Sequence, residues 1–337
     1  MKAQTLIVYD GHADTKTFDF ASPSAGDLTE RSIFLSKEGI AYDESETALA
    51  FSFLSMPRQN LERALQTTVQ NVFESRRHSS VARHEHIYIP GLVPGYWNYY
   101  HLLIDCVPRI LLSLQTAGSA ARILVTRFQA ARLQLGLGDL LTQMGNIFGF
   151  REWLEVADGE LLHLERAIVP KQRVRFIGST IQLFQDVATR SSQATTRTTR
   201  GRVYVSRRLT TARRVLNEAE VIATLRDFGF QPLCLEQMSL EEQIKVFRES
   251  DVVIGPHGAG LANIVFSNPG TTLIEFLQDS ALYKAQIFSE LTTMAGGRHI
   301  VLPCKSEANP QHRVPPSNVD MSVDCSGLRT TLKSLLG

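Results

Sequence analysis

The second half of the chain alternates short apolar segments with amphipathic ones at close spacing. Strands are predicted over residues 203–206, 230–235, 251–255, 272–276 and 299–302. Asn217 precedes one intervening helix, and a capping box, Ser239 with Glu242 three residues on, opens the next. Parallel strands need such crossover helices, so the pattern predicts an α/β fold with a doubly wound parallel sheet. Ligands bind beyond the carboxyl ends of the strands in these sheets, and functional side chains are expected there.

The first half has a weaker pattern of the same kind. Three short apolar segments predict strands: Ile87–Pro90, Arg122–Thr126 and Arg166–Pro170. A long helical pattern over residues 97–114 is interrupted at Pro108, and residues 61–73 predict an amphipathic helix. This half is therefore also expected to be α/β.

A length of 337 residues predicts more than one domain. Residues 191–200 are rich in Ser and Thr and poor in apolar side chains, which is typical of a linker. We expect an N-terminal domain over residues 1–190 and a C-terminal Rossmann-like domain over residues 201–305. A tail over residues 306–337 follows, for which packing back on the N-terminal domain is one arrangement.

Composition excludes several classes of protein. A net charge of +1 argues against a chain built to hold nucleic acid. No stretch reaches the length of a membrane span and the start has no apolar signal region, so we expect a cytoplasmic chain, with peripheral membrane association left open. The four cysteines have no zinc spacing. The chain has no P-loop and no G-x-G-x-x-G, which argues against an ATPase and against a nicotinamide enzyme. It also has no Asp-x-Asp, so we expect a site that needs neither a metal ion nor a cofactor.

A small-residue turn, Gly255-Pro256-His257-Gly258-Ala259-Gly260-Leu261, joins a predicted buried strand to a helix. Small residues let an anion approach the N–H groups of a helix N-terminus, and His257 can add a hydrogen bond. The alternative is a tight turn that needs glycine for its backbone alone.

Two further groups lie at strand ends in the same half. Ser206, Arg207 and Arg208 follow the first strand, in a segment from Val187 to Asn217 that has eight arginines and no acidic residue. The arginine fork matches phosphate oxygens, although a solvated basic loop is the alternative and Arg213 and Arg214 stay ambiguous. Glu275 ends a later strand, where a carboxylate can accept hydrogen bonds from ribose hydroxyls or can serve as a helix cap or salt-bridge partner.

The last group lies in the helical segment of the first half. His101 and Asp105 are four residues apart, Asn98 is expected on the same helix face, and Arg109 follows one turn later. A histidine–carboxylate pair can act as general base towards a hydroxyl. A structural hydrogen-bonded pair is the alternative, which the spacing alone favours.

These residues form ordered blocks that resemble glycosyltransferase family 61. Residues 98–109 match the pattern N-x-x-H-x-x-x-D-x-x-P-R. Further blocks are similar over Tyr204–Arg208 with Arg214 and Asn217-Glu218, over Met238–Gln243, and over Gly255–Asn263, with Glu275 at the next strand end. The resemblance extends from Tyr96 to Phe276.

The resemblance implies a GT-B architecture, in which two Rossmann-like domains face each other across a cleft, and inverting transfer from a nucleotide-diphosphate sugar, usually UDP-linked, to a saccharide hydroxyl. It implies that the N-terminal domain binds the acceptor, that Asp105 is the base with His101 beside it, and that Asn98 and Arg109 are on the acceptor side. The implied donor-binding residues are Ser206, Arg207, Arg208, His257, Gly258, Ala259, Gly260, Asn263 and Glu275. With neither anchor nor signal, the chain resembles bacterial-type members that make capsule or other surface polysaccharide.

Three other functions remain open at this point. A nucleotide-sugar epimerase or hydrolase of the same fold would act without an acceptor. A non-catalytic nucleotide-sugar-binding protein would keep the phosphate-binding residues without needing Asp105. A nucleic-acid binder using the arginine segment would show strongly salt-dependent binding.

Overall fold

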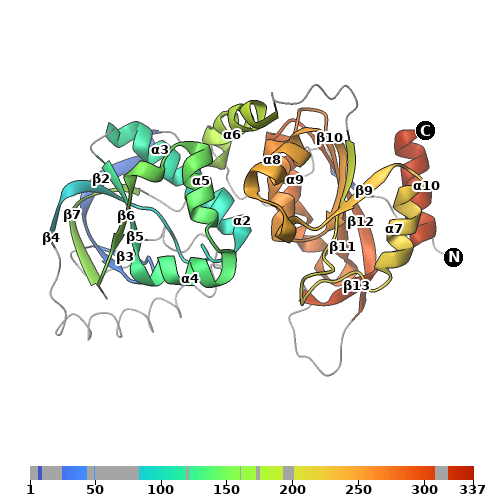
Figure 1. Ribbon diagram of the computed structural model, residues 1–337, viewed down its shortest axis with the longest axis horizontal. Helices are drawn as coiled ribbons and strands as arrows, with labels where there is room; N and C mark the ends of the chain where they lie inside the picture. Colours follow the sequence, from blue (N-terminus) through green and yellow to red (C-terminus); the bar gives the residue numbers. More distant parts are fainter. Residues whose placement is uncertain are drawn as a thin grey trace. The chain divides into compact units, whose positions relative to one another are not determined.

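The computed structural model describes residues 7–9, 25–43, 49, 83–118, 121–159, 161–171, 175–192, 201–307 and 318–337. The helix predicted over residues 61–73 and most of the linker predicted over residues 191–200 lie outside these ranges. The described chain forms two compact units (Figure 1). The N-terminal unit runs to Thr180, and the C-terminal unit holds residues 181–337 together with β1 (Ile7–Tyr9).

Five parallel strands form the centre of the C-terminal unit. They are β8 (Gly201–Val205), β9 (Phe230–Leu233), β10 (Ser250–Pro256), β11 (Thr272–Gln278) and β12 (Arg298–Glu307). Their spatial order is β9-β8-β10-β11-β12, which confirms the predicted parallel sheet. The chain winds outwards in opposite directions from β8 and β10, and in doubly wound sheets the crevice at such a switch point binds ligands.

Two antiparallel strands from distant parts of the chain make this sheet mixed. β1 pairs with β12 through Ile7 and Val301, and β13 (Asp320–Ser322) pairs with the far end of β12 through Lys305 and Ser322. β1 therefore departs from the predicted domain boundary. Because an edge strand exposes a row of unpaired backbone groups, β12 provides pairing partners for both segments.

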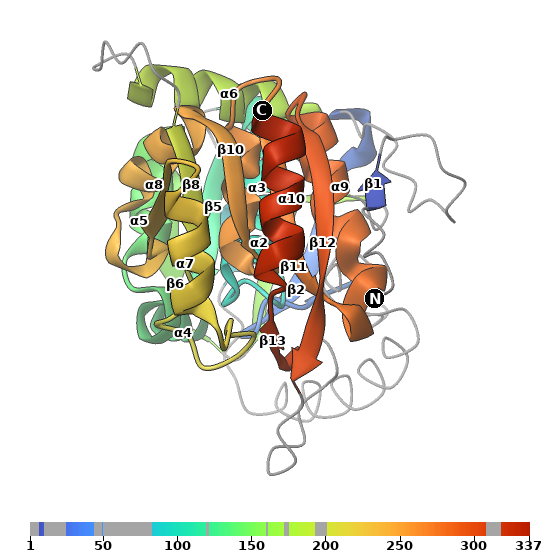
Figure 2. The ribbon, with the colours of Figure 1, turned by 90° about the vertical axis from the view of Figure 1, so that its right-hand side faces the viewer.

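Helices cover both faces of the C-terminal sheet. Figure 2 shows α7 (Glu218–Arg226) and α10 (Cys325–Leu336) on one face, with α8 (Leu240–Arg248) and α9 (Ala285–Met294) towards the other. Leu328 and Leu332 of α10 are fully buried in the core of this unit. The tail thus belongs to the C-terminal unit, contrary to the arrangement considered from the sequence, because its apolar stripe completes that core.

The N-terminal unit contains a six-stranded mixed sheet of order β3-β2-β7-β4-β5-β6. Its strands are β2 (Leu28–Ser36), β3 (Ala41–Tyr42), β4 (Arg83–Pro90), β5 (Ala121–Thr126), β6 (Leu154–Ala157) and β7 (Leu161–Pro170). β7, β4, β5 and β6 are parallel, and β2 and β3 are antiparallel additions at one edge. Its longer helices include α3 (Val107–Ala117), α4 (Arg127–Leu137) and α5 (Leu140–Phe148), and α6 (Ile177–Ser192) leads into the C-terminal unit.

The helix predicted over residues 97–114 is built in three continuous pieces. A short α2 (Tyr99–His101) runs into the π-helical turn η3 (Leu102–Cys106) and then into α3. Pro108 lacks an N–H group and its ring crowds the carbonyl of Ile104, so the backbone widens there instead of continuing the α-helical bonding. π-helical turns of this kind occur frequently at functional sites. None of the helices in the described ranges has the length and apolar character needed to traverse a bilayer.

Candidate functional site

The carboxyl ends of β8 and β10 lie side by side in the sheet, since Tyr204 and Ile254 are in register. The chain leaves β8 into the loop that carries Arg207, and it leaves β10 into the turn that carries His257 and Gly258. The topology therefore brings together, at the switch point, two segments that lie fifty residues apart in the sequence.

The Arg207 guanidinium lies against Gly258. A Cβ atom placed on Gly258 would be 2.2 Å from Arg207 Nη1. Arg207 Nη2 donates to the Ala212 carbonyl oxygen at 3.1 Å, and Nε is buried without a hydrogen-bond partner among the described residues. Gly258 also precedes η7 (Ala259–Phe266), and no side chain caps the N-terminus of that helix. A cation and uncapped helical N–H groups thus meet at one point, an arrangement suited to an anion.

Gly258→Ala is expected to weaken binding of a diphosphate about tenfold, the value of one charge-assisted hydrogen bond, because the new methyl group displaces the Arg207 guanidinium. The clash involves only the flexible end of Arg207, so the melting temperature should stay close to that of the unmodified protein. Titration calorimetry with inorganic pyrophosphate measures the effect. Gly136→Ala, in α4 with no atom within 4 Å of the added carbon, is the matched control. Equal affinity of the two variants would contradict the placement.

A buried carboxylate orients His257. Glu275 Oε1 makes a short contact with His257 Nδ1, and Glu275 Oε2 lies 3.0 Å from His299 Nε2. The carboxylate requires a proton on Nδ1 of His257, so the Nε2 atom, which has no hydrogen-bond partner in the described ranges, is the atom available to a ligand.

Burial and hydrogen bonding together set the charges of Glu275 and His257. Burial raises the pKa of Glu275, but the hydrogen bonds from His257 and His299 outweigh it and hold that pKa below its ordinary value. Burial also lowers the pKa of His257, against the opposing effect of Glu275. The carboxylate is therefore ionised and His257 is neutral at pH 7 in the free protein.

Glu275 does not have the position expected of a ribose ligand. Its side chain has no exposed area and both oxygens are occupied by histidines. The structure instead supports the alternative role, that of a buried partner of other side chains. β11 is a central strand of a sheet covered on both faces, so its side chains are buried.

Two other residues that were expected to bind the nucleotide-sugar donor also have buried side chains. The Ser206 hydroxyl is buried and donates to Glu218 Oε1 at 2.7 Å, while Asn263 is fully buried and donates to Gln243 Oε1 at 2.8 Å. Ser206 links the end of β8 to α7 and Asn263 links η7 to α8, so neither side chain faces an open site. Arg208 remains exposed, with Nε 3.1 Å from Cys234 Sγ, and Ala259 and Gly260 are half-buried in the turn.

The N-terminal unit holds a second polar cluster. His101 Nδ1 is 2.7 Å from Asp105 Oδ2, and Arg175 Nε is 2.9 Å from Asp105 Oδ1. The Asp105 side chain has no exposed area, whereas 23% of the His101 side chain is exposed. The π-helical turn carries the carboxylate between its two partners. A carboxylate that orients an accessible imidazole is an arrangement suited to general base catalysis.

Asn98 and Arg109 do not join this cluster as expected. Asn98 is the N-cap of α2, with extended backbone, and its Oδ1 accepts a hydrogen bond from Tyr100 N at 2.9 Å. It therefore lies outside the helix face that it was expected to share with His101. Arg109 is buried and donates to the Pro90 carbonyl oxygen, so its guanidinium holds α3 to the end of β4 instead of facing an acceptor.

Four charged or polar residues that lie in or beside these sites were not assigned from the sequence. Arg175 and His299 lie far along the chain from the carboxylates that they contact, with no motif around them. Lys284 is the N-cap residue of α9, and Arg213 was ambiguous. Arg213 is the one non-glycine residue in the described ranges with positive φ, at 56°, which is a signal that only the structure provides.

The comparisons with known proteins agree with these blocks. Residues 99–274 match the family model described as Glycosyltransferase 61. The chain is 31% identical over 84 residues, 23% of its length, to Beta-1,2-xylosyltransferase RCN11 of Oryza sativa subsp. japonica. It is 42% identical over 43 residues, 13% of its length, to Beta-1,2-xylosyltransferase of Arabidopsis thaliana. It is 39% identical over 66 residues, 19% of its length, to EGF domain-specific O-linked N-acetylglucosamine transferase of Drosophila melanogaster. The matched segments span 15%, 8% and 12% of these relatives.

Proposed function

Since the chain belongs to glycosyltransferase family 61 and is a glycosyltransferase, we propose that it moves a sugar from a nucleotide diphosphate, with UDP the first to test, to a hydroxyl group of a saccharide. The relatives named above are xylosyl- and N-acetylglucosaminyltransferases, so xylose and N-acetylglucosamine are the first sugars to examine.

The observation that carries the proposal is the meeting of Arg207, His257 and the uncapped start of η7 at the switch point. When the sugar–phosphate bond breaks, its electron pair leaves with the diphosphate, whose negative charge grows. Fixed hydrogen-bond donors and dipoles aimed at such charge are a principal source of catalysis. The Arg207 cation, the His257 imidazole and the N–H groups of η7 support transfer without a divalent metal ion, which we include in the proposal.

Because Asp105 is buried, we assign the roles of general base and of positioning residue to different side chains. A general base must touch the proton that it removes, and His101 has the accessible nitrogen while Asp105 has no exposed area. We therefore place His101 Nε2 against the acceptor hydroxyl, with Asp105 and Arg175 as positioning residues. The acceptor oxygen bonds to the anomeric carbon as the carbon–phosphate oxygen bond breaks on the opposite face, and the hydroxyl proton passes to His101. This displacement inverts the anomeric configuration.

Binding of nucleotides tests the donor half of the proposal. We expect UDP and one UDP-sugar to raise the melting temperature in the presence of EDTA, since a ligand that binds only the folded state stabilises it. Arg207→Met should weaken UDP binding about 10–100-fold through loss of charge-assisted hydrogen bonds. Arg226→Met, which removes an exposed arginine at the end of α7, should leave it unchanged.

Product analysis separates the proposal from other activities of the same fold. Transfer predicts a new glycoside only when a saccharide acceptor is present. Free sugar or an epimerised donor in the absence of an acceptor would indicate a hydrolase or an epimerase instead. Absence of binding by every nucleotide diphosphate tried would refute the donor assignment.

A further inference from the structure

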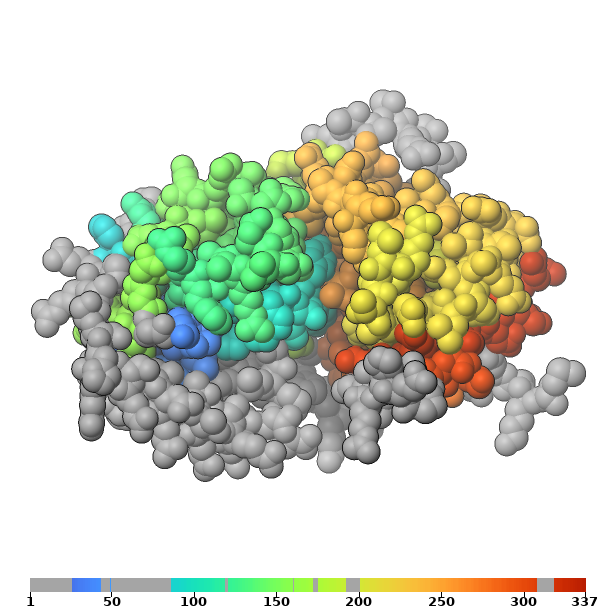
Figure 3. All heavy atoms as spheres, turned by 60° about the horizontal axis from the view of Figure 1, so that its bottom comes forward, coloured from blue at the N-terminus to red at the C-terminus, as the bar shows by residue number. Residues whose placement is uncertain are grey.

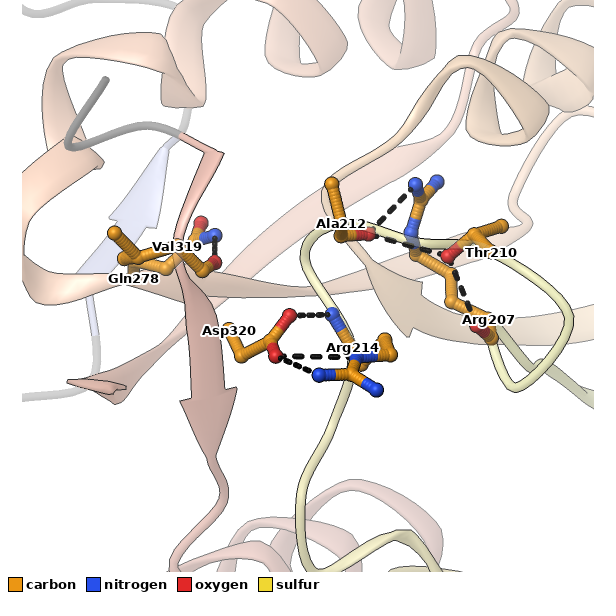
Figure 4. A network of polar contacts seen from close by, with 7 residues as sticks. All are labelled: Arg207, Thr210, Ala212, Arg214, Gln278, Val319 and Asp320. Carbon is orange, nitrogen blue, oxygen red and sulfur yellow. Dashed lines mark hydrogen bonds and ion pairs between the residues drawn. The ribbon is translucent and has the colours of Figure 1, made fainter. Parts of the chain in front are cut away.

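The loop after β8 is fastened on two sides. On one side, Arg207 Nη2 and Thr210 Oγ1 both donate to the Ala212 carbonyl oxygen, each at 3.1 Å. On the other, Arg214 N donates to Asp320 Oδ1 at 2.8 Å and Arg214 Nη2 to Asp320 Oδ2 at 2.7 Å (Figure 4). The residues that follow β8, in yellow, and those of the C-terminal segment, in red, adjoin at the surface (Figure 3). Arg213 stands between these two anchors.

Arg213 has the left-handed backbone conformation, with φ of 56°. Residues other than glycine rarely adopt it, and strained backbone of this kind is found preferentially at ligand-binding and active sites. Hydrogen bonds hold the residue on each side of Arg213, Ala212 through its carbonyl oxygen and Arg214 through its N–H group. A loop without a binding role could relax this strain with Gly or Asn at the position.

The Arg213 side chain lies among like charges. It interacts electrostatically with Arg207 and with Lys284, the N-cap residue of α9. Its Nε is buried without a hydrogen-bond partner, and neither Arg213 nor Lys284 makes an ion pair with any residue of the described ranges. Lys284 is both the last residue of η8 (Asp279–Lys284) and the N-cap residue of α9, so the two helix dipoles act on its charge in opposite senses.

The nearby carboxylates neutralise this group only in part. Glu275 interacts with Arg213, but both of its oxygens are hydrogen-bonded to His257 and His299. Glu236 interacts with Arg207 from an exposed position on η6 (Leu235–Gln237). In the free protein three cations therefore face two carboxylates, and the excess of positive charge is one that a bound polyanion would balance.

We propose that Arg213 and Lys284 act with Arg207 as a three-cation cluster that binds the diphosphate group, and that the left-handed conformation of Arg213 is maintained for this purpose. This inference rests on the proposed function, and it assigns to the phosphate-binding site two residues from outside the turn after β10. It also explains how charge is balanced there without a metal ion.

The effect of the cluster on its own members agrees with this assignment. Burial first, and then the charge of Arg207, lower the pKa of Arg213 to about 10. Burial and the charge of Arg213 lower the pKa of Lys284. The charged forms of both side chains are thus disfavoured in the empty site, and a bound anion would favour them.

Calorimetric titration with UDP and with inorganic pyrophosphate tests the cluster. Arg213→Met and Lys284→Met are each expected to weaken binding of both ligands about 10–100-fold and binding of UMP by much less, since each removes a charge-assisted contact to the diphosphate. Arg226→Met and Lys333→Met, on exposed positions of α7 and α10, are the matched controls.

Stability of the free protein distinguishes a binding role from a structural one. Arg213→Gly removes both the backbone strain and the repulsion, so it should raise the melting temperature while weakening pyrophosphate binding. A lower melting temperature with unchanged affinity would overturn the inference, as would unchanged affinity in both Met variants. If the unmodified protein binds neither UDP nor pyrophosphate, the proposed function itself fails. If it binds them and only Arg207→Met weakens binding, the three-cation cluster alone is wrong.

Discussion

Replacement of His101 by glutamine is expected to lower kcat by about 10²–10⁴-fold, the usual contribution of a general base, while donor affinity stays the same. The imidazole is the accessible member of the His101–Asp105–Arg175 cluster, and no other group in this cluster can take a proton from a hydroxyl at its surface. Steady-state transfer rates and UDP titration measure the two quantities separately. Restoration of activity in His101→Gly by added imidazole would show that the ring itself is required.

Asp105→Asn should lower kcat by a similar factor to the His101 replacement, for a different reason. An amide in place of the carboxylate can donate to His101 Nδ1 and so place the ring proton on Nε2, the nitrogen that has to accept. His86→Gln, at an exposed position of β4, is the control for histidine replacement in the same unit. Normal transfer by the His101 variant would assign the base elsewhere, and normal transfer by Asp105→Asn would show that the carboxylate has no positioning role.

Removal of the Glu275 carboxylate should have the largest effect on stability. Glu275→Ala leaves two buried histidines without their common hydrogen-bond acceptor, and each buried donor left unsatisfied in this way typically costs about 1–3 kcal/mol. Urea unfolding of each variant at pH 7, monitored by circular dichroism, gives the difference in unfolding free energy. Glu241→Ala, exposed in the first turn of α8, should change it by less than about 0.5 kcal/mol.

The pH dependence of that difference follows from the direction of the pKa shift. The pKa of Glu275 is lower in the folded than in the unfolded protein, so its contribution is complete above the unfolded value and is lost as pH falls through the folded one. The two proteins should therefore converge in stability as pH falls below about 4.5. Burial lowers the pKa of His257 in the folded protein. Both proteins should therefore become more stable as pH rises through about 6.5. A difference in unfolding free energy that does not vary with pH would contradict the assignment of charge to Glu275.

Local sequence signals predicted the parts of the fold that local physics decides. The capping box at Ser239 forms as expected: Glu242 N donates to the Ser239 hydroxyl oxygen, and Ser239 N donates to the Glu242 carboxylate. The parallel strands follow from their apolar runs and from the crossover rule. The meeting of Arg207 with the turn after β10 follows from the same rule, because adjacent parallel strands end at one edge.

The remaining features depend on contacts that spacing does not encode. The i, i+4 pair His101–Asp105 was visible, but its third member, Arg175, comes from seventy residues away. The position of Glu275 at a strand end suggested an exposed carboxylate, and only the neighbouring strand, with His299, shows why it is buried. Asn217 illustrates the same limit: it occupies the predicted N-cap of α7, yet its side chain makes no cap and hydrogen-bonds to Val323 of the tail instead.

The pairing of β1 with β12 has a consequence for how the C-terminal unit is made and handled. Ile7 and Val301 are partners, so β1 is synthesised long before β12 and cannot pair with it until residues 298–307 have also been made. No single cut can release this unit intact, because its strands come from both sides of the N-terminal unit in the sequence. A truncated version for crystallisation would need residues 7–9 rejoined to the segment that begins near residue 181, most simply by circular permutation.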